Sequence, residues 1–303
     1  MLVRPLAVGL MTLTVTGLTA AVSPAGVITS GTGYQVGITT YGNLYDSGIG
    51  FRRTDGYDPI SPGTPREGYG VRTSTASGYA DPQAYGTSLT PGSAVFGSGT
   101  ASVTTFLGSQ LQIDQSFGFV AGNVLKIDVT LTNVSGGTLT GIDFRRAVDF
   151  DPSAQFGGGF SETSTANARP AELTGSSYNG FEFPDPTTPF GSPFPAAGGT
   201  FGPGDLGGAY DVGVGSLAAG GTYQFSVFYG INDAGQSESA LRSQLAGLGA
   251  TYTISALGTT GGNSAALGFA AAPVPAPAGL LLGLLATPAL GLIARRRRLN
   301  AAV

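Results

Sequence analysis

Hydrophobic and polar residues alternate most regularly near the middle of the chain. Between residues 124 and 134, single polar or charged residues separate four apolar ones: Leu125, Ile127, Val129 and Leu131. The preceding segment, residues 111–119, repeats this spacing. Successive side chains of a strand point to opposite faces, so a period of two predicts strands with one buried face.

Weaker alternation predicts further strands in both directions along the chain. We expect them at residues 35–41, 68–75, 93–96, 223–229 and 252–254. The glycine turn at residues 135–137 predicts a hairpin, with a partner strand from residue 139 to residue 150. The strand at residues 252–254 is expected to close the domain.

One segment follows a helical pattern instead. Three leucines recur at a helical spacing: Leu241, Leu245 and Leu248. Ser237 before them is a residue type that caps helix N-termini, and Glu238 would lie in the first turn, where a negative charge is favoured. Gly247 or Gly249 is expected to end the helix.

The pattern as a whole predicts an all-β protein, an antiparallel β-sandwich with one short helix in its C-terminal half. Residues 150–211 lack regular alternation and are rich in proline, so we expect a surface excursion there with at most two strands. The sandwich body is expected to span residues 26–258, followed by a flexible linker at residues 259–273.

Composition narrows the chemistry that this body can perform. The chain has no cysteine and no histidine, which removes disulfides, the commonest general base and the usual zinc ligands. The terminal segments 1–25 and 274–303 hold five of the 14 basic residues and none of the 18 acidic ones. The body between them therefore has nine basic and 18 acidic residues and is strongly acidic. We therefore expect no nucleic-acid partner, since phosphate binding needs a positive face.

Three signals follow one another near the C-terminus. A proline-bracketed break comes first, formed by Val274, Pro275, Ala276 and Pro277. An uncharged apolar run at residues 278–294 is predicted to form a transmembrane helix, because about 17–25 apolar residues span a bilayer. The run ends in four arginines: Arg295, Arg296, Arg297 and Arg298. These arginines are expected to stay in the cytoplasm, with the preceding body on the far side of the membrane.

This order of signals resembles the PEP-CTERM sorting signal of exported proteins in Gram-negative bacteria. The resemblance covers residues 274–299, and Ala276 stands where the family usually has a glutamate, which makes a Pro-Ala-Pro variant. It implies that the chain is exported, held by its apolar helix as a membrane-anchored intermediate, and processed near the proline motif by an exosortase-type enzyme. The mature protein is then expected at the cell surface or outside the cell.

The N-terminus carries a matching export signal. Arg4 precedes an apolar core at residues 6–18, and small residues follow at two candidate cleavage sites, after Ala21 and after Ala25. A short positive region, an apolar core and small residues are the three parts of a secretory signal peptide. We therefore predict a signal peptide at residues 1–25.

A second resemblance covers most of residues 68–254. Three motifs carry most of it: the segment Arg145-Arg146-Ala147-Val148-Asp149-Phe150-Asp151, the glycine-bounded segment 215–220, and Phe228-Tyr229-Gly230 before the leucine helix. Together they resemble a β-rich domain that recurs in exported bacterial surface proteins. The resemblance implies a surface location and no established activity.

The best candidate for a metal site is formed by Asp143, Asp149 and Asp151, which share one face of their expected strand with Arg145. Three carboxylates at this spacing could hold Ca²⁺, which binds six to eight oxygens. The alternative is a solvated strand face on which Arg145 neutralises its neighbours; no other cofactor is expected. Arg146 alternates in step with the apolar residues, so either it is buried with partners or a bulge turns it outward. We expect a structural ion pair in preference to a ligand clamp.

No residue is assigned a catalytic role, and the chain is expected not to be an enzyme. The leading hypothesis is a structural or interaction protein of the cell envelope or extracellular matrix. Two alternatives stay open: a carbohydrate-binding module with exopolysaccharide as its partner, and a carboxylate-based polysaccharide-active enzyme. Seven tyrosines of the first third of the chain could stack on sugar rings: Tyr34, Tyr41, Tyr45, Tyr57, Tyr69, Tyr79 and Tyr85.

Overall fold

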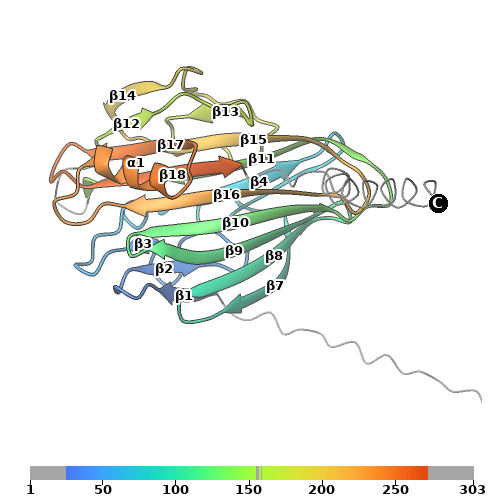
Figure 1. The fold of residues 1–303 in the computed structure, drawn as a ribbon, viewed down its shortest axis with the longest axis horizontal. Coiled ribbons are helices and arrows are strands. Elements are labelled where there is room, and N and C mark those ends of the chain that lie inside the picture. The colour runs from blue at the N-terminus through green and yellow to red at the C-terminus, as the bar shows by residue number, and fades with distance from the viewer. Residues whose placement is uncertain (1–24, 155–156, 158, 272–303) are drawn as a thin grey trace, which may run out of the picture.

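The computed structural model describes residues 25–154, 157 and 159–271. Their regular structure consists of antiparallel strands and one helix, which confirms the all-β class. The strands form two large sheets, stacked face to face in Figure 1, and one small sheet. The predicted signal helix and transmembrane helix lie outside the described residues, and no helix among the described residues is long and apolar enough to cross a membrane.

The larger sheet has nine strands. In spatial order they are β14 (Gly199–Gly204), β12 (Glu162–Ala166), β17 (Tyr252–Gly258), β18 (Ser264–Ala271), β16 (Thr222–Ile231), β10 (Val124–Asn133), β9 (Leu111–Ala121), β8 (Thr100–Leu107) and β7 (Thr90–Phe96). Every neighbouring pair in it is antiparallel.

The second sheet has six strands and the third has three. The six-stranded sheet contains, in spatial order, β13 (Leu173–Ser177), β15 (Gly207–Leu217), β11 (Leu139–Asp149), β4 (Glu67–Arg72), β5 (Ser77–Asp81) and β6 (Gly86–Thr87). The small sheet near the N-terminal end of the described chain contains β1 (Gly26–Thr29), β2 (Gln35–Ile38) and β3 (Phe51–Arg52).

One hydrophobic core lies between the two large sheets. Phe144 of β11 meets Phe225 of β16 edge to face, with ring centroids 5.0 Å apart. Tyr210 of β15 meets Phe269 of β18 in the same way at 5.8 Å. Because each pair joins one sheet to the other, the two sheets pack through their inner faces, as in a sandwich.

The alternating pattern correctly identifies the buried face of the central strands. The four apolar residues of β10 are at most 1% exposed: Leu125, Ile127, Val129 and Leu131. Between them, Asp128 is exposed and Lys126 is half-buried. The strands predicted at residues 35–41, 68–75 and 93–96 also exist, as β2, β4 and β7, with shifted ends.

The prediction of a hairpin at residues 135–137 is wrong, because the two strands on either side of this turn do not pair with each other. β10 pairs with β9 and β16, whereas β11 pairs with β15 and β4 in the other sheet. The connection after Asn133 therefore carries the chain from one sheet to the other. A glycine turn shows where a strand ends, but the strand that follows is free to pair elsewhere.

Two boundary predictions are also wrong. The segment 150–211 holds three complete strands, β12, β13 and β14, and the start of β15, instead of at most two. The predicted linker at residues 259–273 contains β18, which lies between β17 and β16 in the nine-stranded sheet. β17 therefore does not close the domain, and the described body extends to Ala271.

The predicted helix is present as α1 (Glu238–Gly247). The Ser237 hydroxyl accepts a hydrogen bond from the Ala240 N–H at 3.2 Å, as an N-cap does. Gly249 follows the helix with a φ of 104°, and the Ala250 N–H returns to the Leu245 carbonyl. This is the glycine-dependent helix ending expected from the sequence.

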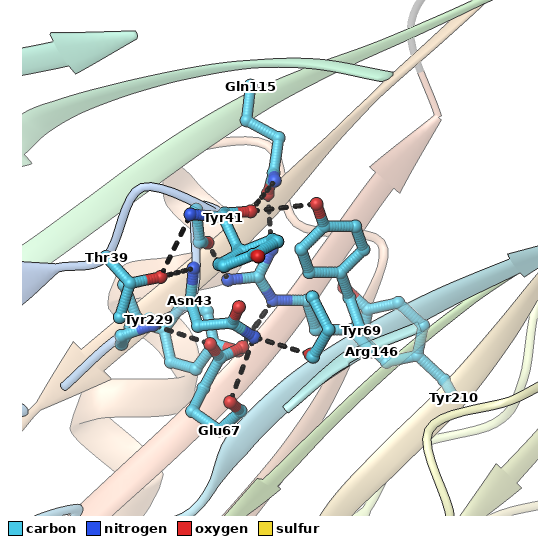
Figure 2. A network of polar contacts seen from close by, with 12 residues as sticks. Thr39, Tyr41, Asn43, Glu67, Tyr69, Gln115, Arg146, Tyr210 and Tyr229 are labelled. Carbon is cyan, nitrogen blue, oxygen red and sulfur yellow. Dashed lines mark hydrogen bonds and ion pairs between the residues drawn. The ribbon is translucent and has the colours of Figure 1, made fainter. Parts of the chain in front are cut away.

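A buried ion pair occupies the middle of the sandwich, as the parity of Arg146 predicts (Figure 2). Arg146 on β11 and Glu67 on β4 are both fully buried and paired through Nε and Oε1. Gln115 Oε1 on β9 accepts from Arg146 Nη1 at 2.6 Å, and the Tyr229 hydroxyl on β16 donates to Glu67 Oε1 at 2.6 Å. The Leu44 N–H donates to the other Glu67 oxygen at 2.6 Å. The pair is thus bonded to both large sheets and to the loop after β2.

We predict that Arg146→Met lowers the free energy of unfolding by about 3–5 kcal/mol, because it leaves the Glu67 carboxylate buried without its cation. Urea unfolding measures the loss. Arg72→Met is the matched control, since Arg72 pairs with Asp143 on the same sheet while its side chain is 41% exposed, and it should cost about 1 kcal/mol or less. Equal losses in the two variants would contradict this account.

Candidate metal centre

Three carboxylates meet where the chain passes between the two large sheets. β11 ends at Asp149, which is paired in register with Gly207 at the start of β15. Asp151 lies two residues beyond Asp149, and Asp205 lies two residues before Gly207, so continuing this register brings them opposite each other. One carboxylate oxygen each from Asp149, Asp151 and Asp205 lies within 4.8 Å of the other two.

Glu162 adds a fourth carboxylate from the first residue of β12. This strand pairs with β14 through Glu162 and Gly204, the residue immediately before Asp205. The Leu206 N–H, on the other side of Asp205, approaches Glu162 Oε2 at 3.5 Å. This contact places the Glu162 carboxylate beside Asp205, and the charges of Asp151 and Asp205 help to raise its pKa.

Three of the four side chains are buried. Asp149 is 3% exposed, Asp151 is 2% and Glu162 is 0%, whereas Asp205 is exposed. Within the described chain, Oδ1 of Asp149, Oδ1 of Asp151 and Oε1 of Glu162 have no hydrogen-bond partner. Buried polar atoms are nearly always hydrogen-bonded, so three unpartnered oxygens in one place require an explanation.

Protein cations do not neutralise this group in the described structure. Among the described residues, no lysine or arginine forms an ion pair with any of the four carboxylates. Arg66 is near enough to lower the pKa of Asp149, but its guanidinium is already bonded to Asp81 and to the Gly180 and Glu182 carbonyls. The negative charge of the cluster is therefore largely uncompensated by side chains.

Burial and mutual repulsion shift the titration of the cluster strongly. Burial, followed by repulsion from Asp151 and Asp205, raises the pKa of Asp149 to about 9. Burial and Asp205 raise the pKa of Asp151 to about 7, and burial and Asp151 raise that of Glu162 to about 8. Burial also raises the pKa of Asp205. The cluster thus favours either retained protons or a bound cation, because both remove the repulsion.

The structure brings together only part of the predicted metal site. Asp149 and Asp151 lie in the cluster, but Asp143 is paired with Arg72, whose Nε donates to its Oδ2 at 2.6 Å. Six residues of extended strand separate Asp143 from Asp149, a distance of about 20 Å. Shared parity along a strand places side chains on one face without bringing distant ones together, so including Asp143 was wrong.

The face that carries Arg145 is also different from the predicted solvated face. Arg145 is 1% exposed in its side chain and pairs with Asp211 through two hydrogen bonds of 2.6 and 2.7 Å. Its guanidinium lies 3.9 Å from the Phe190 ring and donates to the Phe183 and Thr188 carbonyls. The excursion between β13 and β14 therefore covers this face of β11.

The predicted site residues of the C-terminal tail lie outside the part of the chain that the structure describes. The sorting motif Val274, Pro275, Ala276 and Pro277 and the arginines Arg295, Arg296, Arg297 and Arg298 lie outside the described residues. Asp205 and Glu162, which sequence reasoning missed, lie in the excursion that was expected to be a surface connection. Only the pairing register of β11 with β15 and of β12 with β14 brings these two residues to the cluster, and the local sequence pattern does not contain that register.

A scan of protein-family models gives no match for this chain, and a search of curated proteins gives no significant relative. The chemistry of the cluster therefore follows from its own geometry. Its donors are all carboxylate oxygens, which suit hard divalent cations such as Ca²⁺ and Mg²⁺.

We predict a specific pH dependence for this cluster in metal-free buffer. Raised pKa values mean that the folded protein holds more protons than the unfolded chain between about pH 4 and pH 9. The stability that the protonated cluster contributes is therefore complete below about pH 4 and is lost as the pH rises through the folded pKa values.

Glu162→Gln removes one of these titrations while keeping an oxygen for the Leu206 N–H. The stability of the variant relative to the wild type should rise by about 1 kcal/mol or more between pH 5 and pH 9, because the wild-type carboxylate becomes ionised over this range. Thermal unfolding at both pH values, with a chelator present, measures the difference. A stability difference that stays the same at both pH values would show that Glu162 does not repel its neighbours.

Proposed function

We propose that this chain is an exported, non-enzymatic structural or interaction protein of the cell envelope or extracellular matrix of a Gram-negative bacterium. The observation that carries the proposal is the order of signals in the tail: the Pro-Ala-Pro break, the apolar run at residues 278–294 and the arginines 295–298. On this proposal the tail anchors an intermediate in the membrane, and an exosortase-type enzyme then releases the β-rich body.

Two properties of the described body support a non-enzymatic role. The carboxyl groups whose pKa values are raised most, those of Asp149, Asp151 and Glu162, are buried instead of lining an open cleft. Two surface hollows of about 330 and 380 Å³ have no acidic residue in their linings. Glycoside hydrolysis needs a pair of carboxyl groups that flank the sugar bond, and neither hollow offers one.

Mass spectrometry of the mature protein from its host tests the sorting proposal. We predict that the wild-type chain is recovered outside the cell without residues beyond about Gly279. Replacing the four arginines at 295–298 by neutral residues removes the topological determinant, and this variant should stay unprocessed. A mature C-terminal peptide that extends through Leu292 would exclude sorting and indicate an ordinary tail anchor.

A second candidate function, carbohydrate binding, rests on one exposed aromatic pair. Tyr34, Tyr57 and Tyr69 are buried in the core, which excludes them from stacking on a sugar. Tyr85 and Phe181, however, are 41% and 38% exposed, and the Tyr85 hydroxyl donates to the Phe181 carbonyl at 3.2 Å.

Binding to the host's exopolysaccharide tests this second function. If the aromatic pair holds a sugar, Tyr85→Ala should weaken binding about tenfold, in line with about 1–1.5 kcal/mol for a lost aromatic contact. Val120→Ala, which changes an exposed apolar residue on β9, is the control and should leave binding unchanged. Absence of both binding and released reducing ends would favour the structural role.

A further inference from the structure

We propose that Asp149, Asp151, Asp205 and Glu162 form a calcium site that ties the two large sheets together at one end of the sandwich. Two independent observations support it. The first is the convergence of three aspartate oxygens within 4.8 Å of one another. The second is Glu162, a fully buried carboxylate from a different strand. Its Oε2 accepts from the Leu206 N–H, next to Asp205, and its Oε1 has no hydrogen-bond partner within the described chain.

The charge of the group calls for a divalent cation. Four ionised carboxylates carry four negative charges, and Arg66 is the described cation near them, already bonded to Asp81. A proton satisfies one carboxylate at a time, whereas a divalent ion binds several oxygens at once and fills the unpartnered positions together. A cation therefore accounts both for the convergence of the carboxylates and for their missing hydrogen bonds.

The donors favour calcium over other metals. All four are carboxylates, and the chain contains no histidine or cysteine, so zinc and the softer transition metals lack their usual ligands. Ca²⁺ binds oxygens at about 2.3–2.6 Å, so oxygens on opposite sides of it lie about 4.6–5.2 Å apart. The three aspartate oxygens, which lie within 4.8 Å of one another, fit around such an ion. Donors from separate segments also suit the flexible geometry that Ca²⁺ accepts.

The site joins elements that belong to different sheets. Asp149 ends β11 and Asp205 precedes β15, both strands of the six-stranded sheet, whereas Glu162 begins β12 of the nine-stranded sheet. β14 and β15 are separated only by Asp205 and Leu206, so the chain crosses between the sheets at the site itself (Figure 1). A bound cation would therefore hold this crossing to both sheets. Calcium binding by these residues does not depend on where the protein resides. A negative result for the calcium site therefore leaves the sorting proposal untouched, and a negative result for sorting leaves the site untouched.

Thermal unfolding of the full-length chain tests the site. After removal of metals, about 1 mM CaCl₂ at pH 8 should raise the wild-type Tm by about 5 °C or more, the shift expected for a body of this size with the ion well above its Kd. Titration calorimetry with CaCl₂ should give one ion per chain. Asp205→Asn and Glu162→Gln should each lose most of the Tm shift and weaken calcium binding at least tenfold.

Asp143→Asn is the matched control, because it removes a carboxylate of the same strand that lies outside the site. It should keep the full calcium shift, even if its starting Tm is lower. Asp205 is exposed, so replacing it disturbs the core least, and its variant separates lost binding from misfolding. The proposal is overturned if calcium leaves the wild-type Tm unchanged, if MgCl₂ gives the same shift, or if Asp205→Asn responds like the wild type.

Discussion

The structure depends on how ionised side chains are paired inside a protein made mostly of small and apolar residues. Three arginines are almost completely buried, and each has an acid partner: Glu67 for Arg146, Asp81 for Arg66 and Asp211 for Arg145. Breaking such a pair is costly because it leaves an isolated charge away from water. The pairs therefore fix which loops can cover the sheets: Arg146 holds the loop after β2, and Arg66 and Arg145 hold the excursion after β13 through backbone carbonyls.

The cluster of Asp149, Asp151, Asp205 and Glu162 differs from these ion pairs because no arginine or lysine is paired with it in the described chain. The buried acids Glu67, Asp81 and Asp211 each face a guanidinium, whereas these four carboxylates, three of them buried, have no ion-pair partner among the described residues. Buried carboxylates that lie close together without hydrogen-bond partners or an arginine call for a cation, which is the physical basis for placing one there.

Local sequence patterns identified much of the fold because they indicate which face of a strand is buried and where strands and helices end. The period of two revealed the buried face of β10, and the odd parity of Arg146 among apolar residues revealed a buried ion pair. These patterns do not say which strand pairs with which, so the passage from β10 to β11 was mistaken for a hairpin.

β18 was missed because it is rich in alanine and glycine. Its residues are small because α1 packs on it: a Cβ at Gly268 would lie 3.2 Å from Leu245 Cδ2. Likewise, Asp205 and Glu162 join the carboxylate cluster only through long-range register, which local patterns do not contain.

A crystal structure grown from calcium-containing solution tests the central claim most directly. The account predicts a cation bonded at about 2.3–2.6 Å to carboxylate oxygens of Asp149, Asp151 and Asp205, with Glu162 completing the protein ligands. It is contradicted by a calcium-soaked structure in which these oxygens are hydrogen-bonded to one another, or in which Arg66 turns from Asp81 to neutralise them.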